Sequence, residues 1–166
     1  GWARCIAGVS PQARRVTRYA TEKTGMLFDR TRLARLAARL SPSDQLCPVN
    51  ATLYQRCLAS PWSRDLVAQF PTPAVFARRG LGMAVLRRGR LVAGAASYSR
   101  YRGGIEVEVD THPACRGQGL ATAASAALLL ACLDRGLYPS WDAHTRQSLA
   151  LAEKLGYRYS HAYPAY

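Results

Sequence analysis

The chain has 166 residues, a length that fits a single domain and is enough to bury a substantial core. Hydrophobic residues make up 49% of it, yet no apolar run approaches the roughly 20 residues that cross a bilayer, which argues against a membrane-spanning protein or a membrane partner. The formal net charge of +13, carried almost wholly by arginine, attracts polyanions in general, and charge alone does not choose between nucleic acid, an acidic membrane and a phosphorylated cofactor.

The cysteines indicate a reducing compartment. Their number, five, is odd, and they form neither a Cys-x-x-Cys pair nor metal-ligand spacing with a histidine, so we expect free thiols, no metal and a cytoplasmic protein. The start at Gly1-Trp2 has neither a methionine nor a signal-peptide pattern, which indicates a processed or cut chain. The cysteines are Cys5, Cys47, Cys57, Cys115 and Cys132.

Residues 1–60 form an N-terminal part that is expected to be partly helical and to lack preceding sequence. Asp29 or Thr31 is expected to cap a helix whose exposed side carries arginines. Its apolar face consists of Leu33, Leu36, Ala37 and Leu40. The proline-rich stretch from Ser41 to Pro48 is the best candidate for a boundary between the N-terminal part and the rest, although the whole chain is expected to be one compact domain.

Residues 61–166 are predicted to hold the compact core. Apolar spacing predicts a helical connection from Trp62 to Phe70 and a short helix from Pro73 to Arg78. Two strands, Leu81 to Leu86 and Leu91 to Ser99, are expected to form a hairpin.

A third strand, Ile105 to Thr111, shows strict alternation of apolar and acidic residues. Its acidic face consists of Glu106, Glu108 and Asp110. The later elements are a buried helix from Leu120 to Leu133, a strand from Tyr138 to Asp142, a helix from Ser148 to Leu155 and a strand from Tyr157 to Tyr163. This order of elements favours an α+β fold.

A glycine turn lies between the third strand and the buried helix, at Arg116-Gly117-Gln118-Gly119. The first amides of a helix lack internal partners and the helix dipole is positive there, so a diphosphate can bind where glycines let it approach. The common dinucleotide fingerprint would need a third glycine where Thr122 stands, and the phosphate-binding loop of ATPases would need a lysine.

The turn resembles the Arg-x-x-Gly-x-Ala motif of the GNAT superfamily of N-acetyltransferases, with Pro113 three residues ahead of Arg116. The ending Lys154-Leu155-Gly156-Tyr157 is similar to the close of a GNAT domain. Three further segments resemble a bacterial subgroup associated with zwittermicin-type antibiotic resistance: Phe28-Asp29, Glu106-Val107-Glu108 and Pro139-Ser140-Trp141-Asp142-Ala143.

This resemblance implies a GNAT fold, in which a mixed, mostly antiparallel sheet is flanked by helices and a splayed strand pair binds acetyl-CoA as co-substrate. The cofactor-binding residues that it implies are Val109, Asp110, Thr111, Arg116, Gly117, Gln118, Gly119, Leu120, Ala121, Thr122, Thr145 and Ser148.

Direct acetyl transfer to an amine requires a base, an oxyanion site and a proton for the thiolate. Glu108 is the first choice for the base and Glu106 the second, because carboxylates on one strand face repel one another and raise a pKa. The alternative is that these residues form only the solvent face of a strand. Backbone N–H groups from Val109 to Thr111 are expected to hold the oxyanion.

The general acid stays open, because Ala152 stands where GNAT enzymes often carry a tyrosine. Water and the tyrosines of the final strand are alternatives, although aromatic residues there are usually core. Asp110, Trp141 and Asp142 are predicted to bind the acceptor, with a purely structural role for Trp141 as the alternative.

The expected function is acetylation of a primary amine on a small molecule, an antibiotic or a metabolite. Acetylation of protein or aminoacyl-RNA is one alternative, and a non-catalytic acyl-CoA or nucleic-acid binding module is another. Nucleic acid is not favoured, since the arginines are scattered and no nucleic-acid binding motif is present. The oligomeric state, a homodimer included, stays open.

Overall fold

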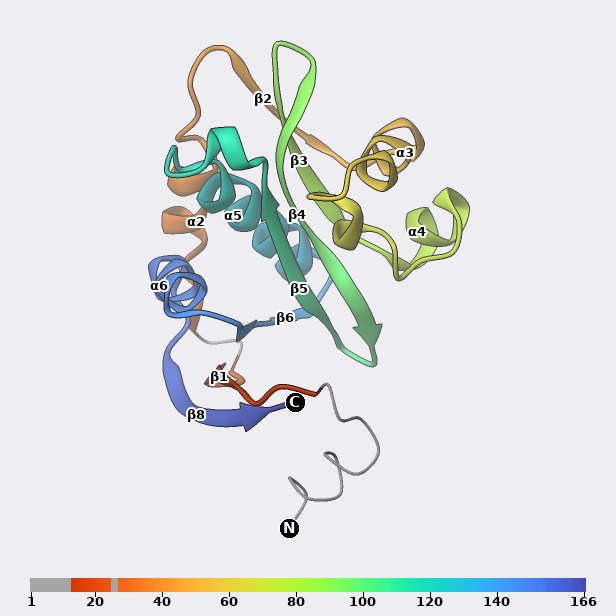
Figure 1. Cartoon of the computed structure of the whole chain (residues 1–166). Coiled ribbons are helices and arrows are strands. Elements are labelled where there is room, and N and C mark those ends of the chain that lie inside the picture. Colours follow the sequence, from red (N-terminus) through yellow and green to blue (C-terminus); the bar gives the residue numbers. More distant parts are fainter. Residues whose placement is uncertain (1–12, 25–26) are drawn as a thin grey trace.

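The computed structural model describes residues 13–24 and 27–166, and within them a five-stranded sheet forms the centre of the molecule (Figure 1). Its strands, in spatial order, are β2 (Asp44–Pro48), β3 (Gly82–Arg87), β4 (Arg90–Tyr101), β5 (Gly104–Thr111) and β6 (Tyr138–Ser140). Neighbouring strands are antiparallel except for β5 and β6, which are parallel. The expected mixed, mostly antiparallel sheet is confirmed.

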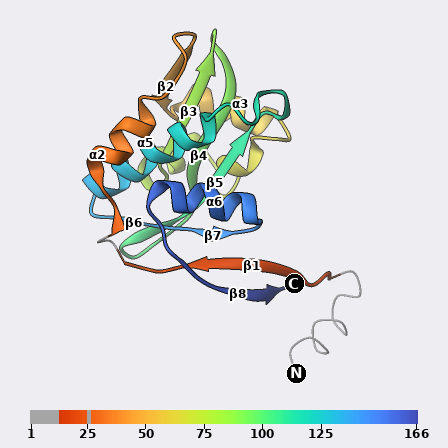
Figure 2. The same cartoon turned by 90° about the vertical axis from the view of Figure 1, so that its left-hand side faces the viewer.

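A smaller three-stranded sheet has the order β7-β1-β8. Its strands are β1 (Val16–Thr21), β7 (Asp142–Ala143) and β8 (Tyr159–Ala165), and both pairings are antiparallel. Figure 2 shows β1 and β8 side by side as a ribbon at one end of the molecule, beside β7. The first described strand therefore lies between two strands from the far end of the chain.

Helices cover both faces of the central sheet (Figure 1). One face carries α2 (Arg30–Ala37), α5 (Leu120–Asp134) and α6 (Arg146–Leu155). The other carries α3 (Ala51–Ala59), the 3-10 turn η2 (Arg64–Leu66) and α4 (Pro73–Arg79). A second 3-10 turn, η3 (Pro113–Cys115), links β5 to the start of α5.

Small residues in β4 let both layers approach the sheet closely. Ala93 and Ala95 are fully buried in the cluster that contains α5, whereas Ala96 belongs to the cluster formed by η2 and its neighbours. A Cβ on Gly94 would lie only 2.8 Å from a methyl carbon of Leu66. The alternation of side chains along the strand thus assigns one face to α5 and the other to η2.

Helix α2 forms as the sequence predicts. The Asp29 side chain caps it by accepting a hydrogen bond from the Arg32 amide at 3.0 Å. Leu33 and Leu36 are 0% and 7% exposed and pack in the same cluster as Leu129 of α5. The apolar stripe of α2 therefore belongs to the core of the molecule.

Three sequence predictions about element boundaries are wrong, and one helix was missed. The stretch from Ser41 to Pro48 is no boundary, because β2 pairs there with β3. Only Arg64–Leu66 is helical in the predicted connection from Trp62 to Phe70. The strand predicted from Tyr138 to Asp142 is interrupted at Trp141, where the chain leaves one sheet for the other. Helix α3, which the Asn50 side chain caps, was not predicted.

The described cysteines are free thiols, namely Cys47, Cys57, Cys115 and Cys132. Cys5 and the start at Gly1-Trp2 lie outside the described residues. In the described part of the chain, no helix combines the length and apolar character that a membrane crossing needs.

Leu33→Ala is expected to lower the free energy of unfolding by about 3 kcal/mol, because it removes a fully buried side chain between α2 and α5. Urea denaturation followed by circular dichroism measures this change. Arg35→Ala, an exposed change on the same helix, is the control and is expected to stay within about 0.5 kcal/mol of the unaltered protein. A loss of only that size for Leu33→Ala would show that α2 is not part of the core.

Candidate functional site

The site begins where β5 and β6 separate. They are paired from Gly104 to Glu106, where Glu106 lies opposite Ser140, and β6 ends there. The Thr21 hydroxyl donates a hydrogen bond to the Trp141 carbonyl at 2.8 Å, and the next residues pair with β1 instead. Beyond Val107, this edge of β5 has no strand partner among the described residues.

The pairing with β4 decides which backbone groups of β5 face this open edge. The His112 amide donates to the Val92 carbonyl of β4 at 2.9 Å, and the register continues without a shift from Thr111 back to Val107. Backbone groups alternate in direction along an antiparallel strand. The N–H groups of Val109 and Thr111 therefore point away from β4, toward the open edge.

The glycine turn lies at the end of the same edge. Gly117 and Gly119 have φ angles of 75° and 79°, a left-handed conformation that favours glycine, and Gly119 is the N-cap of α5. A Cβ at either glycine would meet no atom within 4 Å, so the turn borders open space. The first amides of α5 have no partners within the helix and lie at the positive end of its dipole.

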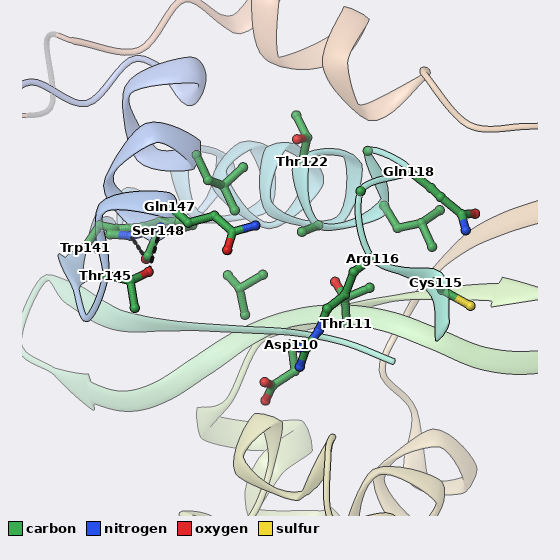
Figure 3. A pocket seen from close by; sticks show the side chains of 16 residues that line it. Asp110, Thr111, Cys115, Arg116, Gln118, Thr122, Trp141, Thr145, Gln147 and Ser148 are labelled. Atoms are coloured by element: carbon green, nitrogen blue, oxygen red, sulfur yellow. Dashed lines mark hydrogen bonds between the residues drawn. The ribbon is translucent and has the colours of Figure 1, made fainter. Parts of the chain in front are cut away.

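The open edge and the turn enclose a pocket of about 360 Å³ (Figure 3). All twelve residues predicted to bind the cofactor line it: Val109, Asp110, Thr111, Arg116, Gly117, Gln118, Gly119, Leu120, Ala121, Thr122, Thr145 and Ser148. It is also lined by Trp141, predicted for the acceptor, and by Cys115, Gln147 and Leu151, which were not predicted. The last two lie on α6, whose packing beside α5 the sequence does not show.

The side chains around this pocket have distinct partners. Arg116 extends back over β5 toward Asp110 (Figure 3), and its charge offsets part of the rise that burial causes in the pKa of that carboxyl. Thr145 caps α6 by accepting from the Ser148 amide at 3.1 Å, and Ser148 accepts from the Trp141 indole at 3.2 Å. Trp141 is 5% exposed, so it supports the pocket wall as a largely buried residue.

A second pocket, of about 690 Å³, adjoins the first, and both are lined by Val109, Trp141 and Ser148. It also has a strongly acidic wall. Its carboxylates are Asp65, Glu106, Glu108 and Asp142. Both glutamates predicted for catalysis thus lie in a cavity next to the pocket that contains the glycine turn.

Burial raises the pKa of the carboxyls along β5. It raises that of Glu108 to about 7, with further increases from Asp110 and Asp65, and the Val109 amide and Arg18 offset part of this. The pKa of Asp110 rises to about 6 by burial and by Asp65. Burial also raises the pKa of Glu106, and a hydrogen bond from Ser140 lowers it in part.

Asp142 is tied to the smaller sheet. The Arg18 guanidinium lies 3.0 Å from Oδ2 of Asp142, and the Tyr163 hydroxyl donates to the same oxygen at 2.5 Å. Oδ1 is buried and has no hydrogen-bond partner in the part of the chain that the structure describes. Asp142 therefore lines the acidic pocket with one oxygen paired and one free.

The acidic pocket also contains Arg18, Asp65 and Tyr98, which were not predicted to belong to the site, and Tyr163, which was only an alternative for the general acid. Tyr98 lies at a bulge, where the register of β4 against β5 shifts between Ser97 and Ser99. No local pattern marks these residues, because distant segments bring them to the pocket.

The tyrosines of the C-terminal segment differ from one another. Tyr157 is 3% exposed and donates to the Pro139 carbonyl, as expected of a core residue. Tyr159 is 44% exposed and Tyr163 lines the acidic pocket, so the core assignment is wrong for both. Ala152 is fully buried in the cluster between α5 and α6. Among residues 13–24 and 27–166, no three His, Cys, Asp or Glu side chains are grouped to hold a metal ion.

Comparison with known proteins gives a family and several relatives. A family model described as GNAT acetyltransferase matches residues 1–166. A curated relative, the uncharacterized N-acetyltransferase YdfB of Bacillus subtilis (strain 168), is 33% identical over 93 residues, which cover 55% of this chain and 36% of that protein.

Solved structures share the fold. A GCN5-related N-acetyltransferase-like protein from Streptococcus suis has a TM-score of 0.93 and 49% identity, covering 98% of this chain and 66% of that one. A predicted acetyltransferase from Clostridium acetobutylicum, solved with acetyl-CoA, has a TM-score of 0.51 and 13% identity over 68% of this chain and 88% of that one, and shows the fold alone. The chain spans less than two thirds of the curated relative and of the Streptococcus protein.

Glu108→Gln is expected to raise the free energy of unfolding by about 1 kcal/mol at pH 8 and to leave it unchanged near pH 4. The pKa of about 7 in the folded protein exceeds the ordinary value of 4.5, so ionisation of Glu108 destabilises the fold as the pH rises through this interval. Urea denaturation at the two pH values measures the effect. The exposed change Glu153→Gln is the control, and equal effects of the two variants at pH 8 would contradict the prediction.

Proposed function

Since the chain belongs to the GNAT acetyltransferase family, we propose that it transfers the acetyl group of acetyl-CoA to a primary amine of a small cationic molecule. The observation that carries this proposal is the junction of two pockets along β5. One contains the glycine turn and the other contains Glu108, whose pKa is about 7. The free thiols of the described cysteines suit a reducing compartment, and we infer a cytoplasmic location.

The first pocket fits a coenzyme A diphosphate. Its turn offers amides at the positive end of α5, and Gly117 and Gly119 leave the approach to them open. The N–H groups of Val109 and Thr111 supply further donors along the open edge of β5. When bound, acetyl-CoA supplies an activated acetyl thioester. In our proposal the chain holds it mainly through backbone groups, and one of the β5 amides donates to the thioester carbonyl.

Glu108 is the proposed general base. With a pKa of about 7 it is partly ionised at neutral pH, and it is basic enough to accept a proton from an ammonium group, directly or through water. Asp110, which is close enough to raise the pKa of Glu108 and lies near Arg116, orients the acceptor. Glu106 lies farther from the glycine turn along β5, so its proposed role is to bind the acceptor amine.

The acidic pocket favours a cationic acceptor. Although the chain carries a net charge of +13, four of its ten carboxylates line this cavity. Ammonium groups are attracted to such a wall. Aminopolyol antibiotics of the zwittermicin type, aminoglycosides and polyamines all have this chemistry.

A macromolecular acceptor is the second candidate, and one surface favours it. A groove between α2 and α6 is lined by basic side chains that have no ion pair among the described residues, namely Arg32, Arg35, Arg39 and Lys154. Such a groove attracts phosphate backbones. Aminoacyl-RNA therefore belongs in any test of acceptors.

Gly119→Asp is expected to weaken acetyl-CoA binding by at least about 100-fold, because it places a carboxylate where the diphosphate is proposed to bind. Isothermal titration measures the affinity. Gly103→Asp is a matched control, since Gly103 also has a positive φ, 83°, and open space at its Cβ position but lies in the β4–β5 turn. A folded protein that binds no acetyl-CoA would refute the proposed function.

Glu108→Gln is expected to lower kcat by at least about 100-fold and to remove the rise of activity with a midpoint near pH 7. Thiol release is measured with diamines, aminoglycosides, zwittermicin-type aminopolyols, neutral amines, peptides and aminoacyl-RNA. Glu153→Gln controls for loss of a carboxylate elsewhere. Unchanged turnover in Glu108→Gln would exclude this base, and a preference for neutral amines or for RNA would refute the small cationic acceptor.

A further inference from the structure

Gln118 lies between the two left-handed glycines of the turn, but its side chain points away from the pocket (Figure 3). Its Oε1 accepts a hydrogen bond from Nη1 of Arg87 on β3, at 2.7 Å. Within the described residues, this is the one side-chain hydrogen bond between residues 116–119 and the central sheet. Arg87 thus connects the turn to the end of the sheet.

Arg87 is itself held firmly by β2. Its Nε and Nη2 donate to the two carboxylate oxygens of Asp44 at 2.7 and 3.0 Å, a two-point contact that fixes the plane of the guanidinium. The Asp44 side chain is only 1% exposed and lies directly opposite Arg87 in the strand register. The hydrogen bond to Arg87 is the main cause of the lowered pKa of Asp44.

The turn needs such support because its glycines make the backbone conformationally flexible. Two glycines within three residues carry a large conformational entropy, and residues 116–119 are all exposed. A loop that must be ordered on binding costs affinity, whereas a loop ordered in advance does not. The bond from Arg87 restricts the residue between the glycines without using any of the amides that face the pocket.

We propose that Arg87, held by Asp44, is a positioning residue that orders the glycine turn through Gln118 before the cofactor binds. This inference rests on the proposed function, since it assigns to the turn the binding of acetyl-CoA. Sequence comparison with the GNAT motif does not reveal the role, because Arg87 lies outside the motif and meets Gln118 only in the folded chain.

The test compares Gln118→Ala, Arg87→Ala and the double variant with the unaltered protein. Gln118 is exposed, so its truncation leaves the fold intact, whereas Arg87→Ala also leaves a buried carboxylate unpaired. Arg88→Ala is the matched control, because it removes the same charge from the neighbouring position of the hairpin. Isothermal titration with acetyl-CoA gives the affinity, and 15N relaxation of the ligand-free protein gives the order of Gly117 and Gly119.

We expect Kd for acetyl-CoA to rise about tenfold in each single variant and no further in the double variant, while Arg88→Ala stays within about twofold. The kcat of Arg87→Ala at saturating acetyl-CoA is expected to stay within about twofold, because Arg87 does not line the pocket and the chemistry occurs elsewhere along β5. In both single variants the order parameters of the two glycines are expected to fall from about 0.85 toward the flexible range below about 0.6.

Unchanged order parameters and affinity in Gln118→Ala would overturn the proposal. Equal losses of affinity in Arg87→Ala and Arg88→Ala would also overturn the proposal. They would show that the positive charge of the hairpin alone attracts acetyl-CoA. Additive losses in the double variant would mean that Gln118 and Arg87 act separately, against the proposal. A folded wild type that does not bind acetyl-CoA would refute the proposed function, and the order parameters would then decide by themselves whether Arg87 orders the turn.

Discussion

The separation of β6 from β5 at Ser140 is the feature on which the rest of the site depends. β6 is the edge strand of the central sheet, and Pro139, which has no N–H, suits such an edge. The buried Trp141 and the hydrogen bond from Thr21 to its carbonyl then direct the chain toward β1. Two strands that begin in parallel thus enclose a wedge between the two sheets.

The wedge brings together two kinds of backbone group that, among the described residues, have no partner in a neighbouring strand or within a helix. Along β5 they are the N–H groups of a strand edge, and at the start of α5 they are the first amides of a helix. An exposed strand edge is normally a liability, because it can pair with another chain. Here the edge lines a pocket, where a ligand with carbonyl and phosphate oxygens can satisfy it.

The arginines and the pocket carboxylates act over different distances. The excess of arginine gives the whole molecule a positive field that attracts anions in general. Within the acidic pocket the carboxylates dominate at short range, and burial raises the pKa of Glu108 into the range useful for proton transfer. Arg18 and Arg116 limit this effect, since each favours the ionised form of a neighbouring carboxyl.

The sequence by itself determined the local elements: the acidic alternation of β5, the glycine turn, the buried helix α5 and the capped helix α2. Each follows from short-range periodicity, from a cap or from a glycine in a left-handed conformation. Only the tertiary structure decided that β1 lies between β7 and β8, that β2 joins the central sheet, and that Arg18 reaches Asp142. The last contact joins residues 124 positions apart, and no local pattern specifies such a pairing.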